Sequence, residues 1–333
     1  MIVDKLNRPI RDLRISVMDT CNYRCTYCMP KEKFDDNYQF LKPDERLSFD
    51  EIEKIVAVFA NYGVNKIRIT GGEPLLRKNL DQLITKIKKI KSIEDIALTT
   101  NGLLLEKQLP SLINAGLDRV NISIDSLDPQ LYHQMSGEKG QLDIVLNAIE
   151  AARNSSLKSV KLNCVVQAGV NENQIIPLLK KYQNTNVVVR FIEYMDVGNK
   201  NDWHLNDVLS FKEIIQIIES QWKIEPINPN YIGEVASRYK YKEFDGEIGF
   251  ITSISKPFCQ DCSRARISAD GKLYTCLFSH QSHDLRKYLR NNPPNLLSQK
   301  IAEIWQARDD RYSELRHQIE TGKDKIEMYV IGG

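Results

Sequence analysis

The order of strand-like and helix-like segments is the feature that most constrains the fold of this chain. The pair Ser48 and Glu51 has the spacing of a capping box, and amphipathic helices are expected from there onward between the strands. Strands are expected at residues 13–17, 66–70, 95–99, 119–123, 158–166 and 187–191. Strands joined through helices run parallel with right-handed crossovers. The sequence therefore predicts a six-stranded parallel sheet.

These strands carry polar side chains on one face. Alternate residues of a strand face opposite sides, so Ile67 and Ile69 face away from Arg68. The apolar face must lie under the helices, which leaves the polar face lining an interior space, the lumen. A closed eight-stranded barrel fills its interior with branched apolar side chains. The sequence instead predicts an α/β fold, an incomplete (βα)6 barrel of the TIM type over residues 1–197, with residues 198–333 as a second domain that closes its open side.

Cations recur on the polar face of these strands. The inward residues that carry a positive charge are Arg14, Arg68, Lys161 and Arg190. A solvated strand end explains any single cation equally well, but four strands with the same arrangement are not expected by chance. A nucleoside triphosphate carries roughly four negative charges, and guanidinium groups pair well with its terminal oxygens. The lumen is therefore predicted to bind a polyanionic ligand.

Three cysteines, Cys21, Cys25 and Cys28, follow the first predicted strand with the spacing C-x3-C-x2-C. Three thiolates on one loop can hold three irons of a 4Fe-4S cube and leave the fourth iron without a protein ligand. An open iron can chelate the amino and carboxylate groups of S-adenosylmethionine and pass it an electron, which splits the sulfonium into methionine and a 5′-deoxyadenosyl radical. The alternative is a zinc site, but zinc wants four ligands and no fourth lies nearby.

A second set of cysteines has the spacing C-x2-C-x13-C: Cys259, Cys262 and Cys276. With His280 or His283 this set would make a Cys3His zinc site. Beside the first triad, an auxiliary 4Fe-4S cluster with its own open iron is favoured. Arg264 and Arg266 follow directly and would bring two guanidinium groups to that iron, where they suit anionic oxygen ligands.

Composition adds limits on where the protein works. The chain has 333 residues, 42% of them hydrophobic, and a net charge of +2, and no basic run suggests nucleic acid. No apolar run approaches the ~20 residues of a membrane span, and no signal or transit segment is expected before the first strand. Six of the seven cysteines stand in the two triads, which argues against disulfides and for a reducing cytoplasm. The seventh, Cys164, is predicted to lie in the core.

Together these motifs resemble the GTP 3′,8-cyclases of the radical SAM superfamily, the molybdenum cofactor biosynthesis protein A family. The resemblance covers about residues 13–333. Besides the two triads it rests on residues 70–74 (Thr-Gly-Gly-Glu-Pro), residues 99–102 (Thr-Thr-Asn-Gly), Arg264-x-Arg266 and the terminal Gly332-Gly333. The Gly-Gly-Glu-Pro segment alone marks only the superfamily, whereas the combination is much more specific.

The resemblance implies a role for each matching residue. The expected GTP contacts are Arg14, Arg68, Thr99, Lys161, Arg190, Arg264 and Arg266. The expected S-adenosylmethionine contacts are Tyr27, Gly72, Glu73, Ser123 and Met195, with Glu73 accepting from the amino group. A flexible terminal pair of glycines, Gly332 and Gly333, could thread into the site without steric cost, although a disordered end is the usual fate of a terminus.

The implied reaction begins with removal of the 3′ hydrogen of the GTP ribose by the deoxyadenosyl radical. The C3′ radical attacks C8 of guanine, and reduction and protonation give (8S)-3′,8-cyclo-7,8-dihydroguanosine 5′-triphosphate, the first step of molybdenum cofactor biosynthesis. The second cluster would anchor the guanine and could supply the electron. Two 4Fe-4S clusters, S-adenosylmethionine, an external electron donor and a downstream pterin synthase are implied, and a homodimer is left open.

Two other functions remain as alternatives. Another two-cluster radical SAM enzyme could act on a peptide or a tetrapyrrole, but it would not need a lumen charged for a triphosphate. A non-catalytic zinc or iron–sulfur scaffold is the second alternative. The first triad, without a fourth ligand, counts against it.

Overall fold

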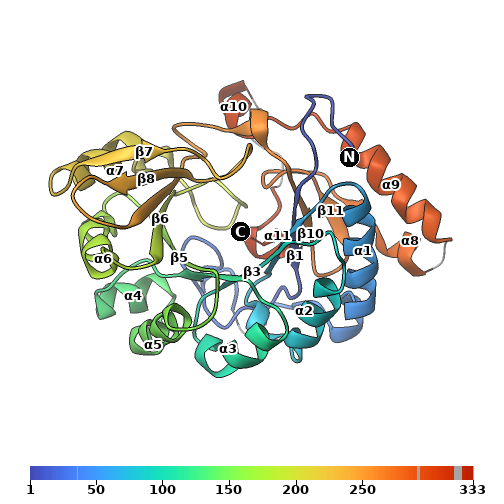
Figure 1. The fold of residues 1–333 in the computed structure, drawn as a ribbon, viewed down its shortest axis with the longest axis horizontal. Coiled ribbons are helices and arrows are strands. Elements are labelled where there is room, and N and C mark those ends of the chain that lie inside the picture. Colours follow the sequence, from blue (N-terminus) through green and yellow to red (C-terminus); the bar gives the residue numbers. More distant parts are fainter. Residues whose placement is uncertain (36, 291–292, 319–324, 333) are drawn as a thin grey trace.

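The computed structural model describes residues 1–35, 37–290, 293–318 and 325–332. Its strands form one sheet with the order β12-β11-β10-β1-β2-β3-β4-β5-β6-β9-β8-β7 (Figure 1). The strands are β1 Asp12–Ser16, β2 Lys66–Thr70, β3 Asp95–Thr100, β4 Arg119–Ser123, β5 Ser159–Val166, β6 Val187–Glu193, β7 Ile224–Ile227, β8 Ser237–Tyr241, β9 Glu247–Ile251, β10 Arg264–Ile267, β11 Lys272–Tyr274 and β12 His283–Asp284.

The six predicted strands are confirmed as β1 to β6, each parallel to the next. The sheet is wider than predicted, because β10 pairs in parallel with β1 and β9 pairs in parallel with β6. Antiparallel strands extend both edges beyond them. Residues after 197 therefore lengthen the same sheet at both edges. The βα alternation could not predict this, since β9 follows β8 in an antiparallel pair and β10 follows a loop.

Helices cover the outer face of the curved sheet (Figure 1). The α-helices among the described residues are α1 Phe49–Asn61, α2 Leu80–Lys88, α3 Leu105–Asn114, α4 Pro129–Met135, α5 Leu142–Arg153, α6 Ile175–Tyr182, α7 Phe211–Glu219, α8 Arg286–Arg290, α9 Pro294–Gln306, α10 Tyr312–Leu315 and α11 Met328–Ile331, of which α11 lies inside the curve. The predicted capping box starts α1: the Glu51 N–H donates to Ser48 Oγ at 3.1 Å, and the Ser48 N–H donates to Glu51 Oε2 at 2.8 Å.

Residue parity on the strands is as predicted. Ile15, Ile67, Ile69 and Leu98 are buried with the helices in one continuous apolar core. Burying a side chain of this size contributes about 1.5–3 kcal/mol. The apolar face of the sheet therefore packs against the helices, and the polar residues between these positions face the lumen.

The last helix returns the chain to the centre of the molecule. Figure 1 shows α11 inside the curve of the sheet, whereas α9 lies outside beside α1. The Tyr62 hydroxyl at the end of α1 donates to the Ser298 carbonyl of α9 at 2.9 Å.

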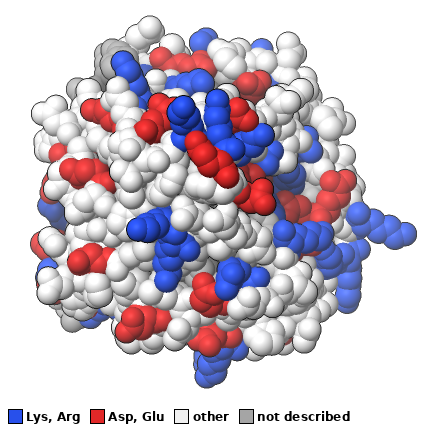
Figure 2. Space-filling view, turned by 60° about the vertical axis from the view of Figure 1, so that its left-hand side comes forward, with Lys and Arg blue, Asp and Glu red and all other residues white. Residues whose placement is uncertain are grey.

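The outer surface carries mixed charge. On the face in Figure 2, lysine and arginine side chains alternate with aspartate and glutamate. Of the described helices, none combines the length and the apolar character needed to cross a membrane.

Candidate functional site

The first cysteine triad borders a cavity at the carboxyl ends of the parallel strands. The triad loop follows β1, and the backbone N–H groups of Cys28 and Met29 close its turn on the Cys25 carbonyl. The cavity is lined by residues of this loop, of the strand ends and of α11, among them Cys21, Cys25, Tyr27, Cys28, Gly72, Thr99, Ser123, Met195 and Tyr329. The fold thus brings together the three thiols and four of the five residues expected to contact S-adenosylmethionine.

A carboxylate, that of Glu193, is among the groups that line this triad's cavity. Burial raises the pKa of Cys21 to about 12, with the Glu73 carboxyl adding to the effect. The donors to Cys21 Sγ are the Tyr23 N–H at 3.4 Å and the Asn101 amide at 4.0 Å. Among the residues that the structure describes around the cavity there is no lysine or arginine. This end of the lumen suits a ligand that carries positive charge.

Glu73, the fifth expected residue, lies behind the cavity wall. Its side chain is 1% exposed, and the carboxylate accepts from the Leu75 N–H at 3.0 Å, Thr100 Oγ1 at 2.8 Å and the Asn101 N–H at 2.8 Å. Burial raises its pKa to about 7. In this structure the carboxylate organises the neighbouring loops.

Close packing against the cysteine loop explains why the residues before Glu73 are glycines. A Cβ on Gly72 would overlap the Thr20 carbonyl, and one on Gly71 would overlap the Met18 carbonyl. The cysteine loop passes directly against them, so only residues without a side chain fit there. The sequence resemblance implies that Gly72 contacts S-adenosylmethionine, and the structure adds this local packing reason for the glycines.

The predicted cations face the lumen in register. Arg266 of β10, Arg14 of β1 and Arg68 of β2 are successive partners on three neighbouring parallel strands. Across the lumen, Arg190 Nη2 donates to Asn121 Oδ1 at 2.6 Å. Burial lowers the pKa of Arg14, and the nearby Arg266 guanidinium lowers it further. Like charges this close together repel each other when no counter-ion is present. The row of arginines therefore favours binding of an anion.

A cavity of about 390 Å³ opens beside this row, at the amino ends of the strands. Arg68, Lys161 and Arg190 line it. Burial lowers the pKa of Lys161 to about 8, with the Arg190 charge as the next cause. Arg14 and Arg264 line a smaller adjoining cavity. Two expected GTP contacts line neither cavity: Thr99 lines the cavity of the first triad, and Arg266 lines the pocket of the second triad.

Sequence reasoning missed several residues of this end. Lys66 and Arg119 share the parity of the cations that were found, so the same rule applied to every strand would have located them. Arg119 forms a two-point ion pair with Asp95. Tyr231, from the loop before β8, places its ring centroid 3.2 Å from Lys66 Nζ. No periodic signal marks a loop residue of this kind.

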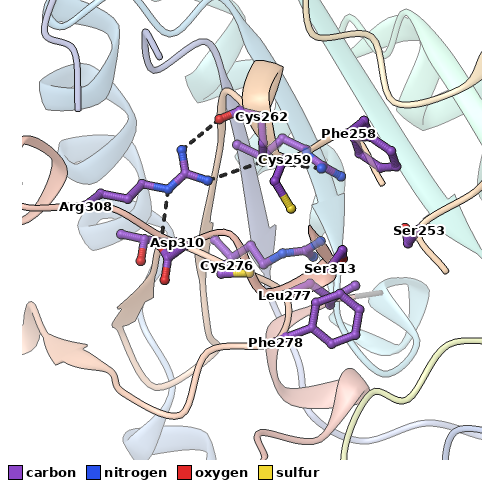
Figure 3. Close-up of a pocket in the computed structure, with 13 residues that line it drawn as sticks. Ser253, Phe258, Cys259, Cys262, Cys276, Leu277, Phe278, Arg308, Asp310 and Ser313 are labelled. Atoms are coloured by element: carbon purple, nitrogen blue, oxygen red, sulfur yellow. Dashed lines mark hydrogen bonds and ion pairs between the residues drawn. The ribbon is translucent and has the colours of Figure 1, made fainter. Parts of the chain in front are cut away.

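The second triad lines one pocket beside β10 (Figure 3). Cys259 and Cys262 come from the loop before β10, and Cys276 follows its antiparallel neighbour β11. Arg264 and Arg266 line the same pocket, as predicted from their spacing. Among the described residues, no three His, Cys, Asp or Glu side chains converge on one ion-sized point.

A buried arginine that the sequence did not reveal contacts this triad. Arg308 Nη2 donates to Cys262 Sγ at 3.3 Å and Nη1 donates to the Cys262 carbonyl at 2.7 Å. Arg264 Nη2 also lies 3.3 Å from the same sulfur. Burial alone would raise the pKa of Cys262, but the two guanidinium groups lower it to about 6. Cys276 lacks such donors, and burial raises its pKa to about 12.

Strand direction sets the two triads apart. The first follows the carboxyl end of β1, and Cys259 and Cys262 precede the amino end of β10, its parallel neighbour. The triads therefore lie at opposite ends of two adjacent strands. Arg14 and Arg266 stand between them as register partners.

The C-terminal tail enters the same space. Arg266 Nη1 donates to the Gly332 carbonyl and, at 3.3 Å, to that of Ile331. Gly332 has a φ of 67°, and a Cβ there would overlap Thr70 Cγ2. The tail thus lies between the strand ends and the cations. Gly333 lies outside the described residues.

Comparison with protein families divides the chain between the helix α6 and the sixth strand, β6. Residues 15–182 match the radical SAM superfamily, and residues 187–314 match the family described as Molybdenum Cofactor Synthesis C.

Curated relatives match over the full length. The chain is 48% identical over 330 residues to a protein of Xanthomonas campestris pv. campestris (strain 8004) named GTP 3′,8-cyclase, covering 99% of this chain and 97% of the relative. A Staphylococcus carnosus (strain TM300) protein of the same name is 47% identical over 337 residues, covering 100% and 99%. The solved structure of Streptococcus suis SuiB bound to S-adenosylmethionine is similar in fold alone, with a TM-score of 0.62, 17% identity, and coverage of 93% of this chain and 68% of that one.

Proposed function

The chain belongs to the GTP 3′,8-cyclase family, and from that premise we propose how its residues carry out the family's reaction. It is a radical SAM enzyme that converts GTP to 3′,8-cyclo-7,8-dihydro-GTP in the first step of molybdenum cofactor biosynthesis. The observation that carries the assignment of roles is the row Arg266–Arg14–Arg68, which stands between the two triads on adjacent parallel strands.

The first triad fits a 4Fe-4S cluster. Cys21, Cys25 and Cys28 border one cavity, as a cube held at three corners requires. When bound, the cluster supplies the electron that cleaves S-adenosylmethionine. Tyr27, Gly72, Ser123 and Met195 hold S-adenosylmethionine in the same cavity. A lining with no lysine or arginine among its described residues admits the sulfonium and ammonium charges of this molecule without repulsion.

Glu73 takes part through its surroundings. Its carboxylate already accepts from Thr100 and from the Asn101 N–H, and it can add the S-adenosylmethionine amino group only at the wall of the cavity. We therefore retain Glu73 as an S-adenosylmethionine contact, with a second task of holding Asn101 beside Cys21.

The cationic end of the lumen binds the substrate. Arg68, Lys161 and Arg190 line a cavity large enough for a triphosphate, and Arg14 and Arg264 adjoin it. Charge-assisted bonds from guanidinium to phosphate are strong and directional. Thr99 lines the cavity of the first triad, where it can contact the ribose next to the cleaved cofactor. Two reactants held in this geometry gain most of their rate from position.

The second triad fits an auxiliary cluster by its donor set, since three thiols share one pocket with Arg264 and Arg266. Cys259, Cys262 and Cys276 would hold this cluster, which would offer an open iron to the guanine ring. Gly332, with Gly333 beyond it, belongs to the catalytic machinery because its carbonyl meets Arg266 and its backbone meets Thr70. The tail thereby fixes a substrate-binding arginine and fills the space through which water would reach the radical.

We further propose a cytoplasmic location, an external one-electron donor and transfer of the product to a pterin synthase. All seven cysteines are free thiols in the structure, which supports a reducing compartment. Residues 1–197 as a partial barrel and 198–333 as an auxiliary-cluster domain remain our proposed division of the chain. All residues assigned to the site come from a single chain, so the assignment does not depend on the oligomeric state.

Anaerobic reconstitution followed by an assay for 5′-deoxyadenosine tests the function. With GTP, 5′-deoxyadenosine and the cyclised dihydro-GTP should form in equal amounts, and ATP should not replace GTP. The matched control omits S-adenosylmethionine. Formation of 5′-deoxyadenosine without any cyclised product in the presence of GTP would contradict the proposed substrate.

A further inference from the structure

A buried network joins the N-terminus of the chain to the loop of the second triad. Asp4 and Arg8 are almost fully buried and paired, with Arg8 Nε 2.6 Å from Asp4 Oδ2. Arg8 Nη1 then donates to the Cys259 carbonyl at 2.7 Å and to the Asp310 carbonyl at 2.8 Å. Residues far apart in the sequence thus meet on the backbone of one cysteine.

Arg308 is the centre of this network. Its side chain is 1% exposed and pairs with Asp4 Oδ2 at 3.1 Å and with Asp310 Oδ2 at 3.3 Å. Its guanidinium lies 4.6 Å from the ring centroid of Trp305, and the Trp305 Nε1–H donates to the Arg8 carbonyl at 3.1 Å. The guanidinium is therefore held by two carboxylates and by the face of an indole ring.

The free edge of Arg308 points at Cys262 (Figure 3). One N–H reaches the sulfur at 3.3 Å and another reaches the carbonyl of the same residue at 2.7 Å. A cation held this rigidly has two effects on a thiolate ligand. It fixes the side chain in the pocket, and it stabilises negative charge on the sulfur. Hydrogen bonds to sulfur and net charge are among the factors that set the potential of an iron–sulfur cluster.

We propose that Arg308 is a positioning residue for the second cluster, held by Asp4 and Arg8, and that it raises the reduction potential of this cluster. One-electron reduction makes the cluster more negative, and a fixed positive charge on a ligand sulfur favours the more negative state. Arg264 also touches this sulfur, but it lines the small cavity that adjoins the proposed substrate site. Arg308 is thus left to serve the cluster whether or not substrate is bound.

The inference rests on the proposed second cluster, and the test separates the two. The parent is the full-length chain with Cys21, Cys25 and Cys28 changed to Ala, so that only the second cluster can form. Its iron content and its midpoint potential are measured by anaerobic titration with dithionite, followed by electron paramagnetic resonance. Arg308→Met removes the charge at similar length, and Arg308→Lys keeps the charge without the fork. Arg311→Met is the matched control, since Arg311 lines a cavity with Cys276 but pairs with Glu314 and, among the described residues, donates to no cysteine sulfur.

Arg308→Met should shift the midpoint potential to more negative values, Arg308→Lys should restore part of the shift, and Arg311→Met should behave as the parent. A purely structural residue would change the melting temperature without this order of potentials. If Arg308→Met does not assemble the cluster, Arg308→Lys becomes the decisive variant. Its midpoint potential should then be more negative than that of the parent. A parent-like potential in the decisive variant overturns this inference alone, whereas a parent that binds no iron overturns the second cluster and the inference together.

Discussion

The two ends of the lumen each carry three cysteines, but in opposite electrostatic surroundings. At the carboxyl ends of the strands, Cys21 accepts from neutral amides, and the described cavity lining has no lysine or arginine. At the amino ends, Cys262 lies between two guanidinium groups, and cations follow on the adjacent strands. Positive charge is therefore concentrated toward one end of the same set of strands. A cationic cofactor can bind at the carboxyl ends of the strands and an anionic substrate at the amino ends, so the two can meet in the middle of the lumen.

Loss of a cysteine should give the largest effect and should differ between the ends. Cys25→Ala is expected to abolish 5′-deoxyadenosine formation, whereas Cys276→Ser should keep the electron paramagnetic resonance signal of the first cluster while cyclised product is lost. The unchanged protein should hold about eight irons, four for each cube. Cys164→Ala, in the core, is the control and should keep both clusters. Zinc in the second site together with normal activity would refute the two-cluster interpretation.

Removal of a lumen cation should affect only the anionic ligand. Arg190→Ala or Lys161→Ala should weaken GTP binding by roughly 10- to 100-fold, since each charge-assisted contact contributes about 1.5–3 kcal/mol. S-adenosylmethionine binding, measured by calorimetry on the same samples, should not change. Lys180→Ala on the exposed face of α6 is the matched control. Equal loss of both ligands would mean that the two ends are not separate.

The tail provides a smaller test where the two ends meet. Gly332→Ala should reduce turnover about tenfold, because a left-handed conformation costs about 1–2 kcal/mol and the new methyl overlaps Thr70 Cγ2. Gly169→Ala is the control, since Gly169 has a similar φ of 74° with open space around it.

Adding Thr70→Ser removes the methyl group that Gly332→Ala would meet, and part of the turnover should return. Iron content and GTP affinity, measured on the same preparations, should stay close to those of the unchanged protein. Full turnover in Gly332→Ala would show that the tail has no role in the reaction.

The smallest effect is a pH dependence confined to the cationic end. Burial and Arg190 lower the pKa of Lys161 to about 8, so the free enzyme loses this charge as the pH rises through that value. The bound triphosphate favours the protonated amine, and binding above pH 8 must take up a proton. GTP affinity should therefore fall, by at most about tenfold per pH unit, between pH 8 and the ordinary lysine pKa. Lys161→Met should flatten this profile, and a profile unchanged in that variant would assign the titration to another group.

The sequence by itself determined the parallel strands and the residues that could do chemistry. The period-2 pattern in Lys66–Thr70 was enough to turn Arg68 inward, because apolar side chains on the other face must lie under helices. Spacing within one loop was enough to group Cys21, Cys25 and Cys28. Such signals are local, so they survive without knowledge of the rest of the chain.

Only the tertiary structure decided what lies beside what. The pairing of β10 with β1 puts Arg266 next to Arg14, although these residues are more than two hundred positions apart. The same pairing sets the triads at opposite ends, and the N-terminal segment carries Asp4 to Arg308. These contacts arise from packing between distant segments. No period or motif records them, since a residue such as Arg308 has the same local pattern whether it is solvated or buried against a cysteine.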